Sequence, residues 1–337
     1  MPGTNPAEAM RVIVGELPEF PHLPELPDRG PGADLTGRTA ALLVGMPVEV
    51  TPRGWRLAER PGRDLARARS MLSSDLDVLE EVLDGFRGPV KVQLCGPWTL
   101  AATLELPHTM NVAIADPGAV ADLTASLAEG AAAFAADVAK RVPGARLVVQ
   151  FDEPALPAVA EGMVPTASGL SRLAAIEADT LRQRLEQVLA STRAYTVVHC
   201  CAPSVPFGII RAAGADGVAF DLGQLRRGDE DGVAESAEAG LGLLAGAVPA
   251  VPDQPVGGAD SGGAGGSSGA HQTAERVIRL WRRLGLPLAT CAEQAVITPA
   301  CGLAGLSPTQ ARAALTRCHQ AASMLPELIE ETGASPR

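Results

Sequence analysis

A histidine and a cysteine stand two residues apart at the end of the apolar run in "YTVVHCCAPSVPF". Side chains at positions i and i+2 of an extended chain face the same side, so His199 and Cys201 can reach one ion, while Cys200 must point the other way. Asp221 ends the following apolar run, and Cys301 lies in "TPACG", just past another. One imidazole and two thiolates with an optional carboxylate suit Zn(II), and an open fourth position would make the site catalytic.

Each of these residues also has an ordinary structural interpretation. A single histidine is more often a satisfied core residue, a single cysteine is more often a small buried apolar side chain, and Cys301 fits a turn equally well. Cys95, Cys291 and Cys318 keep that interpretation, and His319 is expected on a helix surface. The His-x-Cys spacing is far less specific than a doubled Cys-x-x-Cys, so the metal hypothesis depends on all the donors lying at strand ends.

Two adjacent acids, Asp152 and Glu153, follow another apolar run in "VQFDEPAL". Strand alternation points one of them into the centre of the fold and the other sideways. The inward acid is a candidate general base or a partner for a substrate ammonium group. The alternative is an acid that caps a helix or is neutralised by a nearby arginine.

The elements that must position these residues are eight short apolar runs. They cover residues 11–18, 40–50, 89–99, 145–155, 194–201, 216–223, 241–248 and 295–302. Strands buried on both faces of a parallel sheet have this appearance. Eight of them alternating with helical patterns predict a single-domain α/β fold, a (β/α)8 TIM barrel, whose strand ends build the active site.

Helix signals support this alternation. Asp116 with Pro117, and Ser307 with Pro308, predict the starts of two long helices by an N-cap followed by proline at the first helical position. A third helix is expected within 64–86. The sequence has no GxGxxG fingerprint and no P-loop, so the usual nucleotide-binding reasons for an open sheet are absent.

Composition excludes some classes of function. The chain of 337 residues is 46% hydrophobic and carries a net charge of −11, which disfavours nucleic acid or an anionic membrane as partners. We expect a cytoplasmic protein, since we find neither a signal peptide nor an apolar run near the roughly 20 residues of a membrane helix. Six cysteines are too few for a disulfide scaffold.

The barrel is expected to span residues 10–325. Residues 1–9 and 331–337 are expected to be flexible. The Gly/Ser-rich segment 251–272 is expected to be a flexible loop within the barrel, either a mobile lid or a plain insertion.

The motifs "VQFDEPAL", "VVHCCAPSVPF", "GVAFD" and "ITPACGL", in this order, resemble the C-terminal catalytic barrel of cobalamin-independent methionine synthase. "RVIVGELPEFP" resembles the opening strand of that barrel, and "KVQLCGPWTL" resembles its Gly-Pro-x-Thr strand. The resemblance covers about residues 10–325, so the chain is similar to a single-barrel relative of that family.

The resemblance implies a zinc-dependent thiol alkyltransferase. The zinc ligands of the family fall on four residues, His199, Cys201, Asp221 and Cys301. The aspartate that holds the amino group of homocysteine falls on Asp152, next to Glu153. The backbone that grips the substrate carboxylate falls on Val14, Gly15 and Glu16.

Several positions depart from the family pattern. Asp221 stands where the family has a glutamate, and the second substrate-binding glutamate has no counterpart in "LLVGMPVEV". The tryptophan that stacks on folate is replaced by Thr103, although Trp98 is close by. The catalytic histidine after the seventh strand is absent from "GAVPAVP". The residues that match the family's zinc site are therefore largely kept, and those on the folate side of its mechanism are largely absent.

The leading hypothesis is methyl transfer to a thiol, homocysteine above all, to give methionine. The donor would be a methylated folate or a methyl-corrinoid protein, and the latter suits the missing folate-side residues better. One alternative is a zinc-thiolate alkyltransferase for another small thiol, of the epoxide:coenzyme M transferase type. Another is a barrel that binds zinc without catalysis. A uroporphyrinogen decarboxylase is the weaker alternative, because that chemistry needs no zinc.

Overall fold

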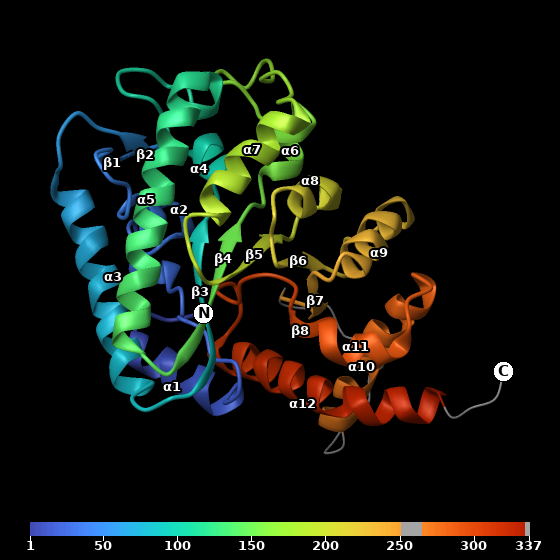
Figure 1. The fold of residues 1–337 in the computed structure, drawn as a ribbon. Coiled ribbons are helices and arrows are strands. Elements are labelled where there is room, and N and C mark those ends of the chain that lie inside the picture. Colours follow the sequence, from blue (N-terminus) through green and yellow to red (C-terminus); the bar gives the residue numbers. More distant parts are fainter. Residues whose placement is uncertain (251–264, 334–337) are drawn as a thin grey trace.

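A computed structural model describes residues 1–250 and 265–333 of the chain. Its centre is a sheet of six parallel strands, in which each strand lies beside its neighbour in the sequence (Figure 1). The strands are β3 (Gly88–Cys95), β4 (Ala145–Asp152), β5 (Tyr195–Cys200), β6 (Gly217–Asp221), β7 (Gly242–Val248) and β8 (Ala295–Pro299). These six confirm the last six of the eight predicted strands.

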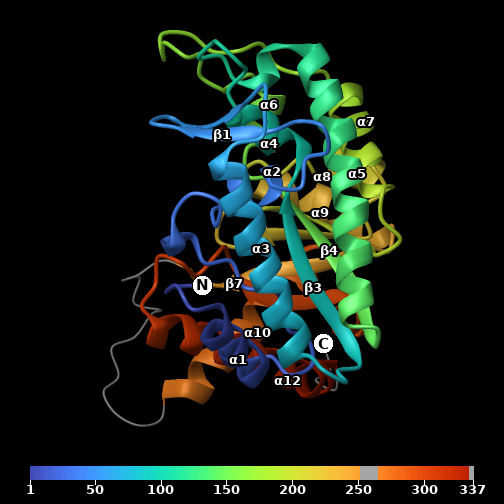
Figure 2. The same ribbon diagram turned by 90° about the vertical axis from the view of Figure 1, so that its left-hand side faces the viewer.

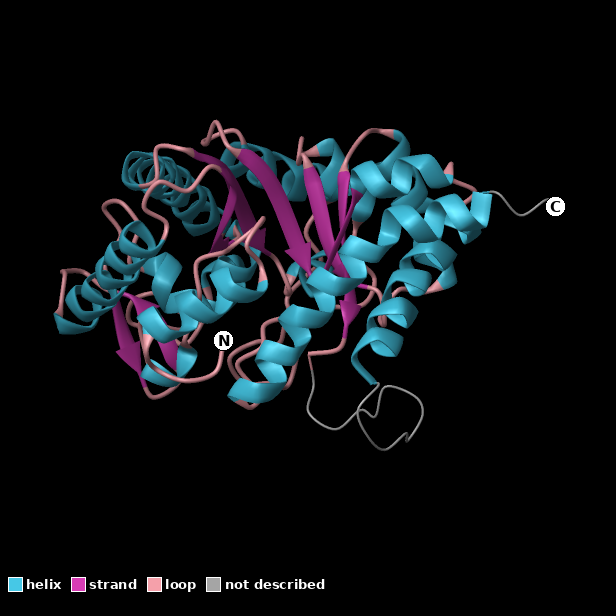
Figure 3. Ribbon diagram, turned by 90° about the horizontal axis from the view of Figure 1, so that it is seen from below, coloured by secondary structure: helices cyan, strands magenta, loops and turns pink. Residues whose placement is uncertain are grey.

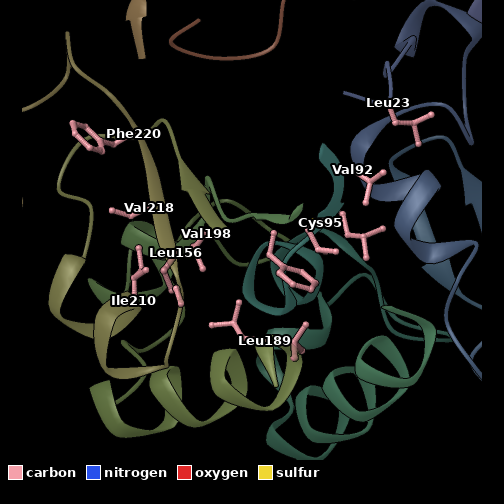
Figure 4. Packing of buried hydrophobic residues seen from close by; sticks show 14 of the residues in the cluster. Leu23, Val92, Cys95, Leu156, Leu189, Val198, Ile210, Val218 and Phe220 are labelled. Carbon is pink, nitrogen blue, oxygen red and sulfur yellow. The ribbon is translucent and has the colours of Figure 1, made fainter. Parts of the chain in front are cut away.

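Helices cover the outer face of this sheet, which explains why its strands are apolar on both faces (Figure 3). Between β3 and β8 they are α4 (Pro97–Thr103), α5 (Pro117–Arg141), α6 (Leu156–Ala160), α7 (Ala178–Leu189), α8 (Phe207–Ala212), α9 (Glu230–Glu238), α10 (Gly265–Arg283) and α11 (Leu288–Gln294). Figure 4 shows Val198, Val218 and Phe220 of the strands gathered with Leu189 and Ile210 of the helices in one packed layer.

The predicted helix starts are confirmed. The Asp116 carboxylate accepts hydrogen bonds from the Gly118 and Ala119 amides at the start of α5, with Pro117 as the first helical residue. The Ser307 hydroxyl accepts from the Gln310 amide before α12 (Pro308–Gly333). The helix expected within 64–86 is α3 (Arg63–Val82).

The first two predicted strands are wrong. Residues 11–16 belong to α1 (Pro6–Glu16), whose N-cap Asn5 accepts from two backbone amides and whose buried face is Ala9, Met10 and Ile13. That spacing follows the period of a helix rather than the alternation of a strand. The run 40–50 begins in α2 (Leu35–Ala40) and reaches only β1 (Val48–Thr51).

Strand β1 pairs antiparallel with β2 (Gly54–Leu57) in a separate two-stranded ribbon. The free side of β3 is instead met by residues 21–23, where the Lys91 amide donates to the Pro21 carbonyl and the Leu23 amide donates to the Lys91 carbonyl. Pro21 has no amide hydrogen, so this ladder cannot extend toward the residues before Pro21.

The sheet is therefore a curled half-barrel rather than the closed (β/α)8 barrel predicted from the sequence. Within the described residues, β8 pairs only with β7, and α12 packs against it. Figure 2 shows α1 and α12 lying together at one end of the molecule, below the strands. One side of the interior is thus enclosed by helices and by the segment before α2.

Three remaining expectations concern flexible segments. Residues 251–264 of the predicted loop lie outside the described residues, while 265–272 form the first turns of α10, so the loop prediction is wrong there. Residues 6–9 are the first turn of α1, and residues 331–333 end α12. Residues 334–337 also lie outside the described part.

Helix α5 is long and apolar enough to cross a membrane by length and composition alone. Half of that stretch is buried inside the protein, where it packs against β4 and α7. Helix α5 therefore has the burial of a core helix.

Candidate functional site

A cavity of about 450 Å³ lies on the concave side of the sheet, between the strands, α12 and the segment before α2. Its walls combine three groups of side chains. One group bears candidate donors, namely Asp152, His199, Cys201 and Cys301; a second is polar or charged, namely His22, Glu25, Lys91, Gln93, Gln150 and His319; and a third is apolar, including Phe20, Leu244, Val296 and Leu315.

Two thiols meet in this cavity from strands that are far apart in the sequence. Cys201 directly follows β5, and Cys301 lies two residues beyond the end of β8. Their Sγ atoms are 3.3 Å apart, within hydrogen-bond distance. The hydrogen bond from Cys201 lowers the pKa of Cys301 to about 6, and the same bond raises the pKa of Cys201. The pair is therefore arranged to share one proton, with the negative charge favoured on Cys301.

His199 is fixed by a carboxylate. Its Nδ1 lies 2.7 Å from Asp152 Oδ1, and the same oxygen accepts a hydrogen bond of 2.7 Å from Gln150 Nε2. Burial lowers the pKa of His199, but the hydrogen bond and charge of Asp152 outweigh burial and raise the pKa above its usual value. With Nδ1 engaged, Nε2 is the ring nitrogen left for another partner, an arrangement that orients metal-binding histidines.

The alternation of β5 separates its two cysteines as predicted. Cys201 lines the cavity, whereas Cys200 is fully buried and does not line it. Burial raises the pKa of Cys200 to about 12, so its thiol stays protonated. Of the two, Cys201 is therefore the one placed to act as a ligand.

Asp221 ends β6 but is not among the residues that line the cavity. Its Oδ1 accepts a hydrogen bond of 2.7 Å from the Gly223 amide, which closes a local turn. His199 lies opposite Ala219, so the positions two residues on, Cys201 and Asp221, share one face of the sheet. The backbone thus aims Asp221 inward, while its carboxylate is held by the loop.

The donor types fit zinc, but their arrangement is incomplete. Two thiols and an imidazole fixed by a carboxylate are the ligands that zinc takes in proteins. Across residues 1–250 and 265–333, no three His, Cys, Asp or Glu side chains form a preassembled metal site. A four-ligand site that included Asp221 would require its carboxylate to reach into the cavity, which it does not line.

Glu153 faces away from the cavity, so its predicted role in substrate binding is not supported by its position. Its carboxylate accepts hydrogen bonds of 2.7–2.8 Å from the Trp98 amide, the Thr99 amide and the Thr99 hydroxyl, at the start of α4. Burial raises the pKa of Glu153 to about 7, despite these hydrogen bonds, which lower it. A side chain at Gly96 would overlap Glu153, so glycine is required there.

Val14, Gly15 and Glu16 were predicted to bind the substrate carboxylate through their backbone, and they also lie away from the cavity. These residues end α1, not a strand, and none of them lines the cavity. Glu16 pairs with Arg312 at 2.6 Å and accepts from the Thr316 hydroxyl, so it ties α1 to α12. Its role in the structure is to join two helices.

Cavity residues that were not predicted to belong to the site include His22, Glu25, Lys91 and His319. Lys91 and Gln93 alternate with Val90, Val92 and Leu94 in β3, a pattern that places polar residues on one face of an apolar strand. That alternation was a usable signal. His319, expected on the surface of a helix, instead faces the cavity from α12.

Comparisons with known proteins agree with this fold. No protein-family model matches the chain, and no curated protein matches it by sequence. A B12-independent methionine synthase from Shewanella sp. W3-18-1, solved in complex with selenomethionine, is similar over 97% of this chain and 89% of its own, with a TM-score of 0.60 and 13% identity. A putative lyase/mutase from Burkholderia cenocepacia J2315 aligns over 98% of this chain and 96% of its own at 14% identity, but with a TM-score of only 0.31.

The likeness to the methionine synthase confirms the resemblance inferred from the sequence at the level of the fold. At 13% identity it shows a shared architecture of an enzyme of that kind. The chemistry of this chain has to be argued from its own cavity.

Proposed function

We propose that this protein is a zinc-dependent methyltransferase that moves a methyl group to a small thiol, with homocysteine as the first acceptor to test. The observation that carries the proposal is the pairing of Cys201 with Cys301 at 3.3 Å, in the same cavity as a histidine fixed by Asp152. These donors come from the ends of β4, β5 and β8, where an α/β enzyme of this kind places its chemistry. The fold shared with a methionine synthase supports the same class of reaction.

His199, Cys201 and Cys301 would hold the metal, with Asp221 as a fourth ligand once its carboxylate turns into the cavity. Zinc, when bound, would supply the positive charge that keeps a substrate thiol deprotonated and nucleophilic near neutral pH. The lowered pKa of Cys301 favours the thiolate form that such a site needs.

The residues around the candidate metal ligands hold those ligands in place and do not react themselves. Gln150 donates to Asp152, Asp152 in turn fixes His199, and the ring cannot turn without breaking that hydrogen bond. Apolar walls from β7, β8 and α12 exclude water from a bound thiol. Holding acceptor and donor in one cavity converts an encounter in solution into a positioned reaction.

The donor of the methyl group is the open part of the proposal. A methylated folate is the donor implied by the resemblance. A methyl-corrinoid protein suits the chain better, because Thr103 stands where the family has its folate-stacking tryptophan. We expect a cytoplasmic protein, in keeping with either donor.

The test starts with the metal. Purified protein should contain close to one zinc per chain, and Cys201→Ala and Cys301→Ala should each lose most of it. Cys200→Ala, which removes the neighbouring buried thiol, should keep the metal. A Cys200→Ala protein without zinc beside a Cys201→Ala protein with zinc would overturn the ligand assignment.

Two further measurements separate catalysis from simple metal binding. Zinc K-edge spectra recorded with and without homocysteine should show that the zinc gains a sulfur ligand when homocysteine is present. Radiolabelled methyl from methyltetrahydrofolate or methylcobalamin should appear in methionine. An unchanged spectrum would favour a barrel that binds zinc without catalysis, and the absence of label from both donors would end the methionine proposal.

A second candidate is an alkyltransferase for another small thiol, for example one that opens an epoxide. The positions of Glu153 and of Val14–Glu16 favour it, because these predicted contacts to an amino-acid substrate do not reach the cavity. A panel of thiols offered to the zinc-loaded protein would separate the two candidates by which thiol changes the zinc spectrum.

A further inference from the structure

Lys91 stands out by its rarity and its place. The chain has 28 basic residues of the Lys and Arg types, and only Lys91 and Lys140 are lysines. Lys140 is exposed near the end of α5, whereas Lys91 lies within β3 and its side chain lines the cavity. Lysine offers a compact charge on a flexible stem, which suits a pocket better than the planar fork of arginine.

The ammonium group of Lys91 has a neutral partner. Its Nζ donates to Gln93 Oε1 at 3.3 Å, and Gln93 Nε2 donates to the Leu23 carbonyl at 2.8 Å, which fixes the amide. No carboxylate of residues 1–250 or 265–333 lies within 4 Å of Lys91 Nζ. An ammonium group has three protons to donate, so this one has capacity left for a ligand.

The nearby acids are engaged elsewhere. Glu25 lies 3.4 Å from Arg38, and Asp152 is bound to His199. Burial lowers the pKa of Lys91 below its usual value, and the negative charges of Asp152 and Glu25 offset only part of this shift. A buried charge without an ionic partner is costly, and a bound anion would offset that cost.

The position of Lys91 relative to the two thiols indicates what kind of ligand would fit the cavity. Lys91 lies on the first strand of the half-barrel, Cys201 follows the third and Cys301 follows the last, so the charge and the thiol pair face one cavity from different strands. Leu244 and Val296 give the cavity apolar wall that suits methylene groups. A molecule with an acid at one end and sulfur at the other would match both features.

We propose that Lys91 and Gln93 form an anion subsite that binds the carboxylate of the acceptor thiol and so selects thiol acids over neutral thiols. This rests on the proposed function for the sulfur end alone. It moves carboxylate recognition from the backbone of Val14–Glu16, which the structure places outside the cavity, to a side chain of β3. Lys91 is a specificity-determining residue in this scheme.

The experiment compares matched ligands by calorimetry on the full-length, zinc-loaded protein. 4-Mercaptobutyrate, its neutral amide 4-mercaptobutyramide, and homocysteine differ only at the acid and amino groups. The acid should bind at least about tenfold more tightly than the amide, as expected for a hydrogen-bonded charge pair. Equal affinity would overturn the subsite. Comparing the affinities of homocysteine and 4-mercaptobutyrate then shows whether the protein also recognises the amino group.

Variants assign the preference to one residue. Lys91→Met should abolish the preference for the acid, Lys91→Arg should restore part of it, and Lys140→Met is the matched control that should leave it unchanged. A preference that survives in Lys91→Met would overturn the proposal. The comparison of acid with amide on the unmodified protein is decisive even if a variant fails to fold.

A ligand without sulfur separates this inference from the proposed function. Butyrate needs no metal, so its binding to metal-free protein can be followed by saturation-transfer NMR, with butyramide as the control. Saturation transfer that is lost in Lys91→Met supports the anion subsite even if no thiol binds zinc. If thiols bind zinc but butyrate contacts survive in Lys91→Met, the subsite is wrong and the proposed function stands.

Discussion

The two sides of the cavity are held together by different forces. The strand side, β3 to β8, is a continuous ladder of backbone hydrogen bonds with apolar side chains packed behind it. The side formed by residues 17–40 contributes only two ladder bonds, at Pro21 and Leu23, and is anchored by a buried charge cluster. In that cluster Asp75 of α3 binds both Arg29 and Arg38.

Because of this difference, the two sides of the cavity should differ in how well they tolerate substitutions. A ladder distributes its stability over many peptide groups, so the thiols at its strand ends tolerate changes elsewhere. A charge cluster concentrates stability in few groups, because removing one partner leaves the others buried and unpaired. The thiol end of the cavity should therefore tolerate substitutions, and the end formed by residues 17–40, which includes Glu25, should be sensitive to them.

The largest effect is expected from Asp75→Ala. Asp75 is only 1% exposed, and it accepts two hydrogen bonds from Arg29 and one from Arg38 at 2.6–2.8 Å. Its loss leaves Arg29 without its ionic partner and Arg38 with only Glu25 at 3.4 Å, and should lower the free energy of unfolding by about 3–5 kcal/mol. Urea unfolding measures this. Asp179→Ala, which removes an exposed partner of Arg182, should cost at most about 1 kcal/mol.

If Asp75→Ala cost no more than Asp179→Ala, the charge cluster would not anchor this side of the cavity. Hydrogen exchange adds a sharper test. Protection should fall first in α1 and in residues 21–40, while β4 to β6 stay protected. Equal loss of protection across the sheet would contradict the contrast between the two sides.

On the strand side, a pH effect of similar size is expected from Glu153. Its pKa is about 4.5 in the unfolded chain and about 7 in the folded protein, so the folded state binds the proton more tightly. The stabilisation is complete below about pH 4.5 and is lost as the pH rises through 7, a change of roughly 3 kcal/mol. Urea unfolding between pH 5 and 8 should show this fall, and Glu153→Gln should flatten it. A variant that keeps the same slope would assign it to other groups.

The junction between the two sides gives an intermediate effect. A Cβ at Gly130 of α5 would lie 2.3 Å from the Leu42 carbonyl oxygen, so Gly130→Ala must push the helix away from the N-terminal region. Overpacking of this kind costs about 1–3 kcal/mol. Thermal unfolding checks it, with Ala136→Ser on the exposed face of α5 as a neutral control. No loss of stability would mean that this contact can relax freely.

The smallest effect has the opposite sign. Gly15 lies inside α1 with nothing within 4 Å of the place where a Cβ would stand. Gly15→Ala should therefore stabilise the protein by about 0.5–1 kcal/mol. Gly45, equally open but with φ of +71°, is the contrast, since Gly45→Ala should destabilise it by about 1–2 kcal/mol. Loss of thiol binding in Gly15→Ala would restore the substrate role predicted from the sequence.

The strand side was largely predictable because its chemistry follows from alternation. The run that ends in His199 places Cys201 inward and Cys200 outward, and both follow from strand geometry. Cys301 is 100 residues further along, yet it joins Cys201 because parallel strand ends share one edge. Strand alternation alone does not predict the position of the Asp221 carboxylate, because this group accepts a hydrogen bond within a local turn.

The N-terminal side could not be predicted in the same way. The run Val12–Val14 is too short for periodicity to separate a strand from a helix, although Asn5 and Pro6 are a usable start signal for α1. The cluster around Asp75 joins residues 37 to 46 positions apart, which no local pattern reveals. Alternation in β3 places Lys91 and Gln93 on one face of the strand, but only the curvature of the sheet shows that this face lines a cavity.

The helix that stands beside β8 has a consequence for how this protein can diversify. Leu315, Cys318, His319 and Ala322 of α12 form the wall where a closed barrel would have strands. A helix satisfies its peptide groups internally, so this wall can change shape without breaking a ladder that neighbouring strands share. Substitutions on this one face of α12 would therefore reshape the cavity and leave the sheet that carries Cys201 and Cys301 unchanged.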